Sequence, residues 1–234
     1  MRVERENVLL RAFFTSLEKV GSLPAYEAFG REAERTGCRG ATVFRGAEGL
    51  VGRRHIGWKR LSVSEELPLV VEVIDAAGRI DRLVRGAAPL LRGRFVTRER
   101  AAVIVHRRKS GGTHPEDSSG GGEEGPMPRE EAGTLLRVFL SEGDRHGKKP
   151  LAREILDRAA AAGMEMALVL KCPAGYGAHR EERSAKSEVT AMDQPVVVEI
   201  ADSEERVRAF LPRIEEILVE GLVTIEGVTI LRVG

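Results

Sequence analysis

The chain has 234 residues, of which 42% are hydrophobic and 31% charged, values that are typical of a globular protein of about two domains. No apolar run reaches the ~18 to 20 residues of a membrane span and no signal peptide is evident, so we expect a cytoplasmic protein without membrane insertion. The net charge is +1, but the first half is basic, with 22 Lys/Arg and 13 Asp/Glu in residues 1–109, and the second half is acidic. Only 4% of the residues are aromatic and none is interleaved with a run of basic residues, so we expect no nucleic-acid partner.

An internal repeat is the main signal in the sequence. The segment Leu9–Phe14 returns as Leu135–Leu140 at an offset of 126 residues, and after one inserted residue Pro68–Asp75 returns as Pro195–Asp202 at an offset of 127. A period this long does not fit a solenoid and indicates two copies of one small domain. We place the first domain at residues 7–107, a Gly/Ser/acidic linker at 108–132, which we expect to be flexible, and the second domain at 133–234.

In chain order, the first copy is predicted to begin with a buried strand over Val8–Phe14. A helix from Ser22–Pro24 to Thr36 follows, with Ser22 as its N-cap, and then a short strand over Ala41–Arg45. A Gly/Arg-rich loop runs from Gly46 to about Leu67. The apolar run Leu69–Ile74 predicts a fully buried strand.

Asp75 is predicted to start the second helix of the first copy, whose apolar residues recur at helical spacing. Two short strands, Phe95–Thr97 and Ala101–Val105, close the unit. In the second copy the corresponding helix has Ser203 in a capped start and Pro212 in its interior. Its predicted inner face consists of Val207, Phe210, Leu211, Ile214, Ile217 and Leu218.

The resulting order, β-α-β-β-α-β in each copy, predicts an α+β fold of two tandem ferredoxin-like domains, each an antiparallel sheet with helices on one face. The other face of each sheet would remain bare. We therefore expect it to pack on a second sheet, either in the sister copy or in another chain.

The turn after the first strand of the second copy is the richest polar cluster. It carries Asp144, Arg145, His146, Gly147, Lys148 and Lys149 just before a predicted helix. Basic side chains beside free backbone N–H groups suit a phosphate or carboxylate. The alternative is a solvated turn in which Asp144 makes a local backbone bond. A metal at His146 is disfavoured because no second His, Cys or spaced carboxylate completes a site.

The long loop after the second strand is the other candidate, because about 20 irregular residues are unusual in so small a unit. In the first copy it carries Arg53, Arg54 and His55, followed by Trp58, which could stack on a ligand ring or pin the loop to its own domain. In the second copy it begins with Gly175, Tyr176 and Gly177.

No motif in the chain indicates catalysis. No nucleophile stands beside a base, and no Walker or Rossmann fingerprint occurs, so we expect a protein that is not an enzyme. Glu72 and Glu199 recur at one strand position, which favours a structural bond to a neighbouring loop or subunit over a perturbed base. Cys38 and Cys172 fall at different positions of the two copies and are expected to be free thiols.

These residues resemble the PII-like family catalogued as domain of unknown function 190. Ser141–Leu151 follows the acidic-basic turn of that family, and Gly175–Gly177 follows its Gly-Phe-Gly segment. Val63–Pro68 resembles the exit of its long loop. Two closing elements also match, in Phe210–Pro212 and Gly221–Thr224. The resemblance covers both copies but not the linker.

This resemblance implies a ferredoxin-like fold, trimers with sheets packed inward, and kinship to PII signalling proteins and copper-tolerance CutA proteins. In PII proteins the long loop engages partners and nucleotides bind between subunits. The resemblance therefore suggests an adenine nucleotide as the first ligand to consider, although no motif indicates a cofactor. Because some members are encoded beside fluoride-exporting channels, a membrane transporter or channel is a candidate partner.

Each copy departs from the family pattern in a different part. The first copy keeps the basic loop Arg53–His55 but replaces the turn with Ser16–Gly21, whereas the second copy keeps the turn but has a divergent polar loop. We therefore expect a PII-like regulatory protein that binds a small anionic ligand at a domain or subunit interface and acts on a partner through its long loops. The expected site is composite, with the turn of copy two facing the loop of copy one across the interface. Drift in an unused site would leave the same pattern. The alternatives are an assembly or protein-interaction module without a small ligand, and a CutA-like metal-binding protein.

Overall fold

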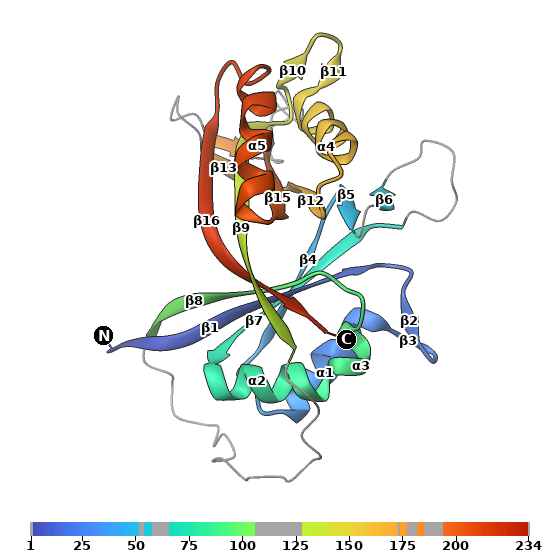
Figure 1. The fold of residues 1–234 in the computed structure, drawn as a ribbon, viewed down its shortest axis with the longest axis vertical. Helices are drawn as coiled ribbons and strands as arrows, with labels where there is room; N and C mark the ends of the chain where they lie inside the picture. The colour runs from blue at the N-terminus through green and yellow to red at the C-terminus, as the bar shows by residue number, and fades with distance from the viewer. Residues whose placement is uncertain are drawn as a thin grey trace. The chain divides into compact units, whose positions relative to one another are not determined.

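A computed structural model describes residues 2–51, 54–57, 66–105, 128–172, 174–176, 182–184 and 194–233 (Figure 1). The chain forms two compact units. Unit 1 contains residues 1–44, 69–131 and 229–234, and unit 2 contains residues 45–68 and 132–228. Each unit thus includes a segment from the other sequence copy.

Unit 1 is built from the first copy and the end of the last strand of the chain. Its strand order is β4-β7-β1-β8-β16, with β1 and β8 antiparallel. The C-terminal part of β16 pairs with β8 through Thr229 opposite Arg98 and Ile230 opposite Thr97. The elements of the first copy are β1 (Arg2–Thr15), β2 (Lys19–Val20), β3 (Leu23–Pro24), α1 (Ala25–Arg35), β4 (Ala41–Arg45), β7 (Pro68–Ala76), α2 (Ala77–Gly86), α3 (Ala88–Leu91) and β8 (Val96–Val105).

Unit 2 is built from the second copy and from part of the loop of the first. Its strand order is β16-β9-β15-β12-β5-β6, so the first-copy strands β5 (Glu48–Val51) and β6 (Arg54–Gly57) stand at the edge of the sheet. The helices α4 and α5 lie side by side on one face (Figure 1). The second-copy elements are β9 (Arg129–Ser141), β10 (Arg145–His146), β11 (Lys149–Pro150), α4 (Leu151–Ala161), β12 (Met166–Lys171), β13 (Ala174–Tyr176), β14 (Glu182–Ser184), β15 (Pro195–Asp202), α5 (Glu204–Glu215) and β16 (Leu222–Arg232).

Both units have a hydrophobic core between the helices and one face of the sheet. In unit 1 the alternate residues Val8, Leu10, Ala12 and Phe14 of β1 point into this core, where Phe14 packs against Phe29 of α1 with ring centroids 5.6 Å apart. In unit 2 the predicted inner face of α5 lies in the core, which also takes Leu50 from β5. The period-2 and period-3.6 apolar patterns of the sequence therefore set these cores.

The predicted fold is confirmed: both copies follow the β-α-β-β-α-β order in antiparallel sheets. The loop of the first copy is not purely irregular, however, because it contains β5 and β6. Strand β9 begins at Arg129, within the span predicted as linker, while residues 106–127 lie outside the described part of the chain. None of the described helices is long and apolar enough to span a membrane.

Two helix starts differ from the sequence prediction. Helix α1 begins at Ala25 with Pro24 as its cap residue, because Ser22 is taken up by the turn between β2 and β3. Helix α2 begins at Ala77, two residues after Asp75. The buried Asp75 carboxylate instead accepts hydrogen bonds from the backbone N–H groups of Arg39 and Ala76, each at 2.8 Å, and so fixes the end of β7.

Four further predictions concern the strands β7 and β8, the cap of α5 and the cysteines. Strand β7 is not fully buried, since Ile74 is 43% exposed at its end. The two short closing strands are one continuous strand, β8. The Ser203 cap of α5 is confirmed, because its hydroxyl accepts the N–H of Arg206. Both cysteines are free thiols, as expected, and partial burial raises the pKa of each.

Candidate functional site

The polar turn of the second copy is held by Asp144. Its carboxylate accepts the backbone N–H of Ser141 at 2.8 Å, and its carbonyl accepts the N–H of Leu151, the first residue of α4, at 2.9 Å. Between these anchors β10 and β11 form a short hairpin that turns at Gly147, whose φ of 60° favours glycine. The local backbone bond that the sequence left as an alternative for Asp144 is therefore present.

The turn of the first copy has the same construction with a different acid. Glu18 accepts the N–H of Thr15 at 2.9 Å through its carboxylate and the N–H of Ala25 at 2.8 Å through its carbonyl. Gly21, the counterpart of Gly147, also has a φ of 60°. Both turns have the same two hydrogen bonds from the acid although their basic residues differ. The acid therefore stabilises the turn, and the basic residues are not needed to form it.

The basic residues of the second-copy turn differ in what they contact. Arg145 donates to the carbonyl oxygens of Glu142 at 2.9 Å and Asp144 at 3.3 Å. His146 and Lys148 are exposed to solvent. Lys149 is bound by two carboxylates of α4. Arg145, His146 and Lys148 are therefore the side chains of this turn best placed to meet a ligand from solvent.

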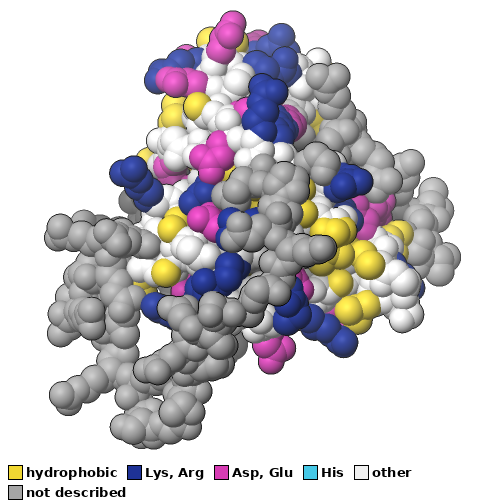
Figure 2. All heavy atoms as spheres, turned by 60° about the horizontal axis from the view of Figure 1, so that its bottom comes forward, with side chains coloured by type: hydrophobic (Ala, Val, Ile, Leu, Met, Phe, Trp, Pro, Cys, Tyr) yellow, Lys and Arg dark blue, Asp and Glu magenta, His cyan; other side chains and the backbone are white. Residues whose placement is uncertain are grey.

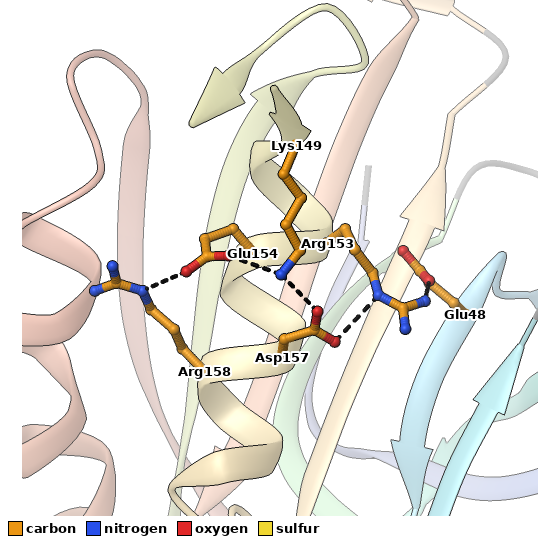
Figure 3. A network of polar contacts seen from close by, with 6 residues as sticks. All are labelled: Glu48, Lys149, Arg153, Glu154, Asp157 and Arg158. Atoms are coloured by element: carbon orange, nitrogen blue, oxygen red, sulfur yellow. Dashed lines mark hydrogen bonds and ion pairs between the residues drawn. The ribbon is translucent and has the colours of Figure 1, made fainter. Parts of the chain in front are cut away.

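A network of ion pairs covers the outer face of α4 (Figure 3). The Lys149 ammonium lies 2.7 Å from Glu154 and 2.6 Å from Asp157. Asp157 also pairs with Arg153 at 3.1 Å, and Glu154 with Arg158 at 2.9 Å. The hydrogen bonds from Lys149 and then Arg158 lower the pKa of Glu154 to about 2 and keep it ionised.

The first-copy loop enters this network through Glu48 of β5, which binds Arg153 of α4 (Figure 3). Strand β5 pairs antiparallel with β12, with Leu50 opposite Ala167 and Glu48 opposite Val169. Ala47 also donates its N–H to the carbonyl of Val169 at 2.8 Å. The structure thus brings the root of the first-copy loop and the second-copy turn to the same helix.

Several predicted site residues cannot be assigned contacts. Arg54 and His55 form part of β6, and Gly175 and Tyr176 part of β13, but only their backbones are described. Arg53, Gly177 and Trp58 lie outside the described residues. The composite site therefore rests on the placement of the loop root, and the role of these side chains stays a prediction.

The recurring carboxylates Glu72 and Glu199 each bind an arginine of the neighbouring strand. Arg11 of β1 contacts Glu72 at 2.9 Å, and Arg137 of β9 contacts Glu199 at 2.9 Å. Arg137 also binds Glu226 of β16 at 2.6 Å. The structural bond that we expected is present, but its partner is a strand of the same unit rather than a loop or another subunit. The repeat of Arg11 as Arg137 at the same offset was the signal for it.

Sequence analysis also missed Glu48 and Arg153, because nothing local in the chain links residues 105 positions apart. The signal in the sequence is the pair of glycines near Glu48, Gly46 and Gly49, which permit close approach to β12. A Cβ on Gly49 would lie 2.9 Å from the carbonyl oxygen of Ala167, so the close approach of β5 to β12 requires glycine there. Among the described residues, no group of three His, Cys, Asp or Glu side chains could hold a metal ion.

We expect Glu154→Gln to lower the stability of the protein at pH 7 and to flatten its loss in acid. The native pKa of Glu154 is depressed, so its contribution is present above the ordinary value of 4.5 and is lost as the pH falls toward about 2. The pair is solvent-accessible, which limits the effect to about 1 kcal/mol or less. Urea unfolding at pH 7 and pH 3 measures it, with Glu34→Gln on the exposed side of α1 as control. Equal losses at both pH values would contradict this assignment.

Comparison with known proteins places both copies in one family. The family model described as "Uncharacterized ACR", domain of unknown function 190, matches residues 7–103 and 133–230. Two proteins of Aquifex aeolicus (strain VF5), each named UPF0166 protein, are 40% identical over 97 residues and 28% identical over 96 residues. These matches cover 42% and 41% of this chain and 91% and 94% of the relatives, so each relative corresponds to about one copy.

The similarity of the chain to solved structures is weaker than its match to the family model. The PII-like protein CPII of Thiomonas intermedia K12, determined with ADP, AMP and bicarbonate, is 21% identical with a TM-score of 0.31, over 43% of this chain and 90% of that chain. A protein of Galdieria sulphuraria is 14% identical with a TM-score of 0.25, over 96% of this chain and 98% of that one. The family model, in contrast, covers most of the chain and coincides with the observed repeat. The chain therefore belongs to the family of domain of unknown function 190, as two tandem copies.

Proposed function

We propose that the protein is a non-catalytic, PII-like regulatory protein that binds a small anionic ligand in unit 2 and acts on a partner through its long loops. The observation that carries the proposal is the pairing of β5 with β12, which builds the root of the basic first-copy loop into the unit that bears the Asp144 turn. An adenine nucleotide is the first ligand to test, and a membrane transporter or channel the first partner.

The electrostatics of unit 2 support an anion at the turn. The carboxylates nearest the turn are already matched: Glu154 and Asp157 by Lys149, and Glu142 by Lys171 at 2.6 Å. The Asp144 carboxylate is bound to the backbone N–H of Ser141, and Arg145 and Lys148 are exposed beside it, so an incoming phosphate would meet these exposed cations. Backbone N–H groups at the start of α4 would add to the attraction if the turn shifts on binding.

The composite site is tested by two pairs of charge reversals. Arg145→Glu with Lys148→Glu changes the turn, and Arg53→Glu with Arg54→Glu changes the loop. We expect each pair to weaken nucleotide binding at least about tenfold in calorimetric titration, since losing one charge-assisted hydrogen bond costs ~1.5–3 kcal/mol. The matched control is Lys19→Glu, because Lys19 occupies the position of Arg145 in the first-copy turn.

The outcomes separate the candidate functions. If ATP, ADP or AMP binds but only one pair of reversals affects it, the composite site is wrong although a ligand site exists. If Lys19→Glu weakens binding as much as the turn variants do, the effect comes from net charge alone. Failure of all three nucleotides to bind the wild-type protein would contradict the nucleotide proposal.

A non-catalytic assembly module is the second candidate, and it is favoured by exposed apolar side chains in unit 1. Val43, Phe44 and Ile74 are 46%, 41% and 43% exposed at the end of the sheet where β4 lies. Figure 2 shows hydrophobic side chains among basic and acidic ones on the described part of the face that it views. Self-association that weakens with added salt would support an assembly held by the charged halves.

A further inference from the structure

Strand β4 forms an open edge of the unit 1 sheet. It pairs with β7 on one side, and within the described part of the chain no strand pairs with its other side. All five residues, Ala41–Arg45, are exposed, including two large apolar side chains. Proteins usually protect such an edge, since its free N–H and C=O groups can pair with another chain.

The equivalent strand of the second copy, β12, is covered. Val169 occupies the position of Val43 at the offset of 126, yet it is 3% exposed whereas Val43 is 46% exposed. The difference arises because β5 pairs along β12 and adds the β5–β6 hairpin to this edge. The structure therefore shows how an edge of this type is covered: by the hairpin that grows from the long loop of the other copy.

The second copy carries a hairpin of its own at the matching place. Strand β13 begins at Ala174, which is the repeat counterpart of Glu48, where β5 begins. Gly175 occupies the position of Gly49, the glycine that allows close approach to the paired strand. Strands β13 and β14 form a separate two-stranded sheet. The described chain thus contains a docked hairpin with its acceptor edge, and a second hairpin and a second edge that are not paired with each other.

We propose that β13 of one chain pairs with β4 of a second copy of the same chain. The register of β5 on β12, carried over by the repeat, sets Tyr176 opposite Ala41, Gly175 opposite Thr42 and Ala174 opposite Val43. This inference goes beyond the proposed function and does not depend on a ligand. It gives Val43 a covering partner.

Charge at the helix beside each edge explains why the second-copy hairpin fits β4. In unit 2, Glu48 of the docked hairpin binds Arg153 of α4. The repeat position of Arg153 in α1 is Glu27, which is exposed. A first-copy hairpin on β4 would bring Glu48 near Glu27, and like charges would oppose it. The second-copy hairpin has Ala174 in place of Glu48, so it avoids that repulsion.

Each chain then offers the β13–β14 hairpin as the donor and the β4 edge as the acceptor. Contacts of this head-to-tail kind join chains into a closed ring when the rotation between them closes, and into a filament when it does not. The chain mass of 25.6 kDa is the reference for a monomer. The proposal therefore predicts a concentration-dependent oligomer whose formation requires β4.

Disulfide trapping tests the pairing and its register. In a background with Cys38→Ser and Cys172→Ser, a chain with Val43→Cys is mixed with a separate chain carrying Ala174→Cys and oxidised mildly. We expect a disulfide-linked heterodimer on a non-reducing gel, since directly opposed strand residues have the Cβ spacing that a disulfide needs. The control pair is Thr42→Cys with Ala174→Cys, whose side chains would lie on opposite faces of the joined sheet and should link much less.

A second measurement uses light scattering at several concentrations. We expect Val43→Lys to shift the mass toward the monomer, and Val219→Lys, at a residue that is 99% exposed in unit 2, to leave it unchanged. Circular dichroism checks that each variant is folded. A wild-type monomer at all concentrations, or equal linking in both cysteine pairs, would overturn the proposal. So would a Val43→Cys/Ala174→Cys double variant that closes only within one chain while the mixed chains do not link.

Discussion

Replacing Glu72 by Leu is expected to lower the free energy of unfolding by about 3 kcal/mol, because breaking a buried ion pair typically costs ~3–5 kcal/mol and leaves a charge in a poor environment. The Arg11 side chain is only 3% exposed, so water cannot replace the carboxylate that it loses. Phe13 also packs under the guanidinium at 5.4 Å from its ring centroid, which restricts movement of Arg11 toward solvent. Chemical denaturation at pH 7 measures the loss.

The second copy supplies a matched control for this experiment. Glu199→Leu removes the equivalent carboxylate, but Arg137 is 22% exposed, so water can solvate the guanidinium that it leaves. We therefore expect a smaller loss than for Glu72→Leu. The double variant Arg11→Met/Glu72→Leu should recover much of the stability, because an apolar pair of similar volume replaces both charges of the Arg11–Glu72 ion pair. A double variant as unstable as Glu72→Leu alone would show that the charge is not the cause.

The repeated Arg and Glu positions show what the sequence can predict and why. A side chain that recurs at a fixed offset in an apolar strand occupies the same place in both copies, so Arg11–Glu72 and Arg137–Glu199 could be anticipated from the repeat. The succession of strands and helices along the chain and the buried faces of the helices follow from hydrophobic periodicity. The start of α2 could not be predicted as well, because Asp75 can cap a helix or bond to the Arg39 backbone, and tertiary contact decides.

The docking of β5 is the part that the sequence does not determine locally. Glu48–Val51 has no alternating apolar pattern, and its only described residue in the unit 2 core is Leu50. The repeat does not predict which copy the hairpin pairs with, because the sequence of the loop is the same whether its hairpin joins its own copy or the other one. The same holds for the candidate site. The turn at Asp144 can be predicted from the sequence, but the contact between Glu48 and Arg153 cannot, because it forms only when β5 pairs with β12.

Gly49 is the residue on which that docking depends most directly. Its missing side chain allows β5 to lie against β12, where an added Cβ would approach the Ala167 carbonyl oxygen to 2.9 Å and the Pro68 ring to 3.4 Å. A flexible side chain could move away from such a contact, but the Ala167 oxygen belongs to the backbone of a central strand. The strain must therefore be relieved by movement of β5.

We expect Gly49→Ala to destabilise the protein by about 1–3 kcal/mol, the usual cost of overpacking a close contact, and to loosen β5 from β12. Hydrogen exchange of the Ala47 amide, which donates to Val169, reports the loosening directly. Gly78→Ala in α2 is the matched control, because no heavy atom lies within 4 Å of its added Cβ and alanine favours helix. Uncovering β12 would also expose an edge like that of β4, so Gly49→Ala should increase self-association. Unchanged exchange at Ala47 in a folded Gly49→Ala protein would show that β5 does not dock through this contact.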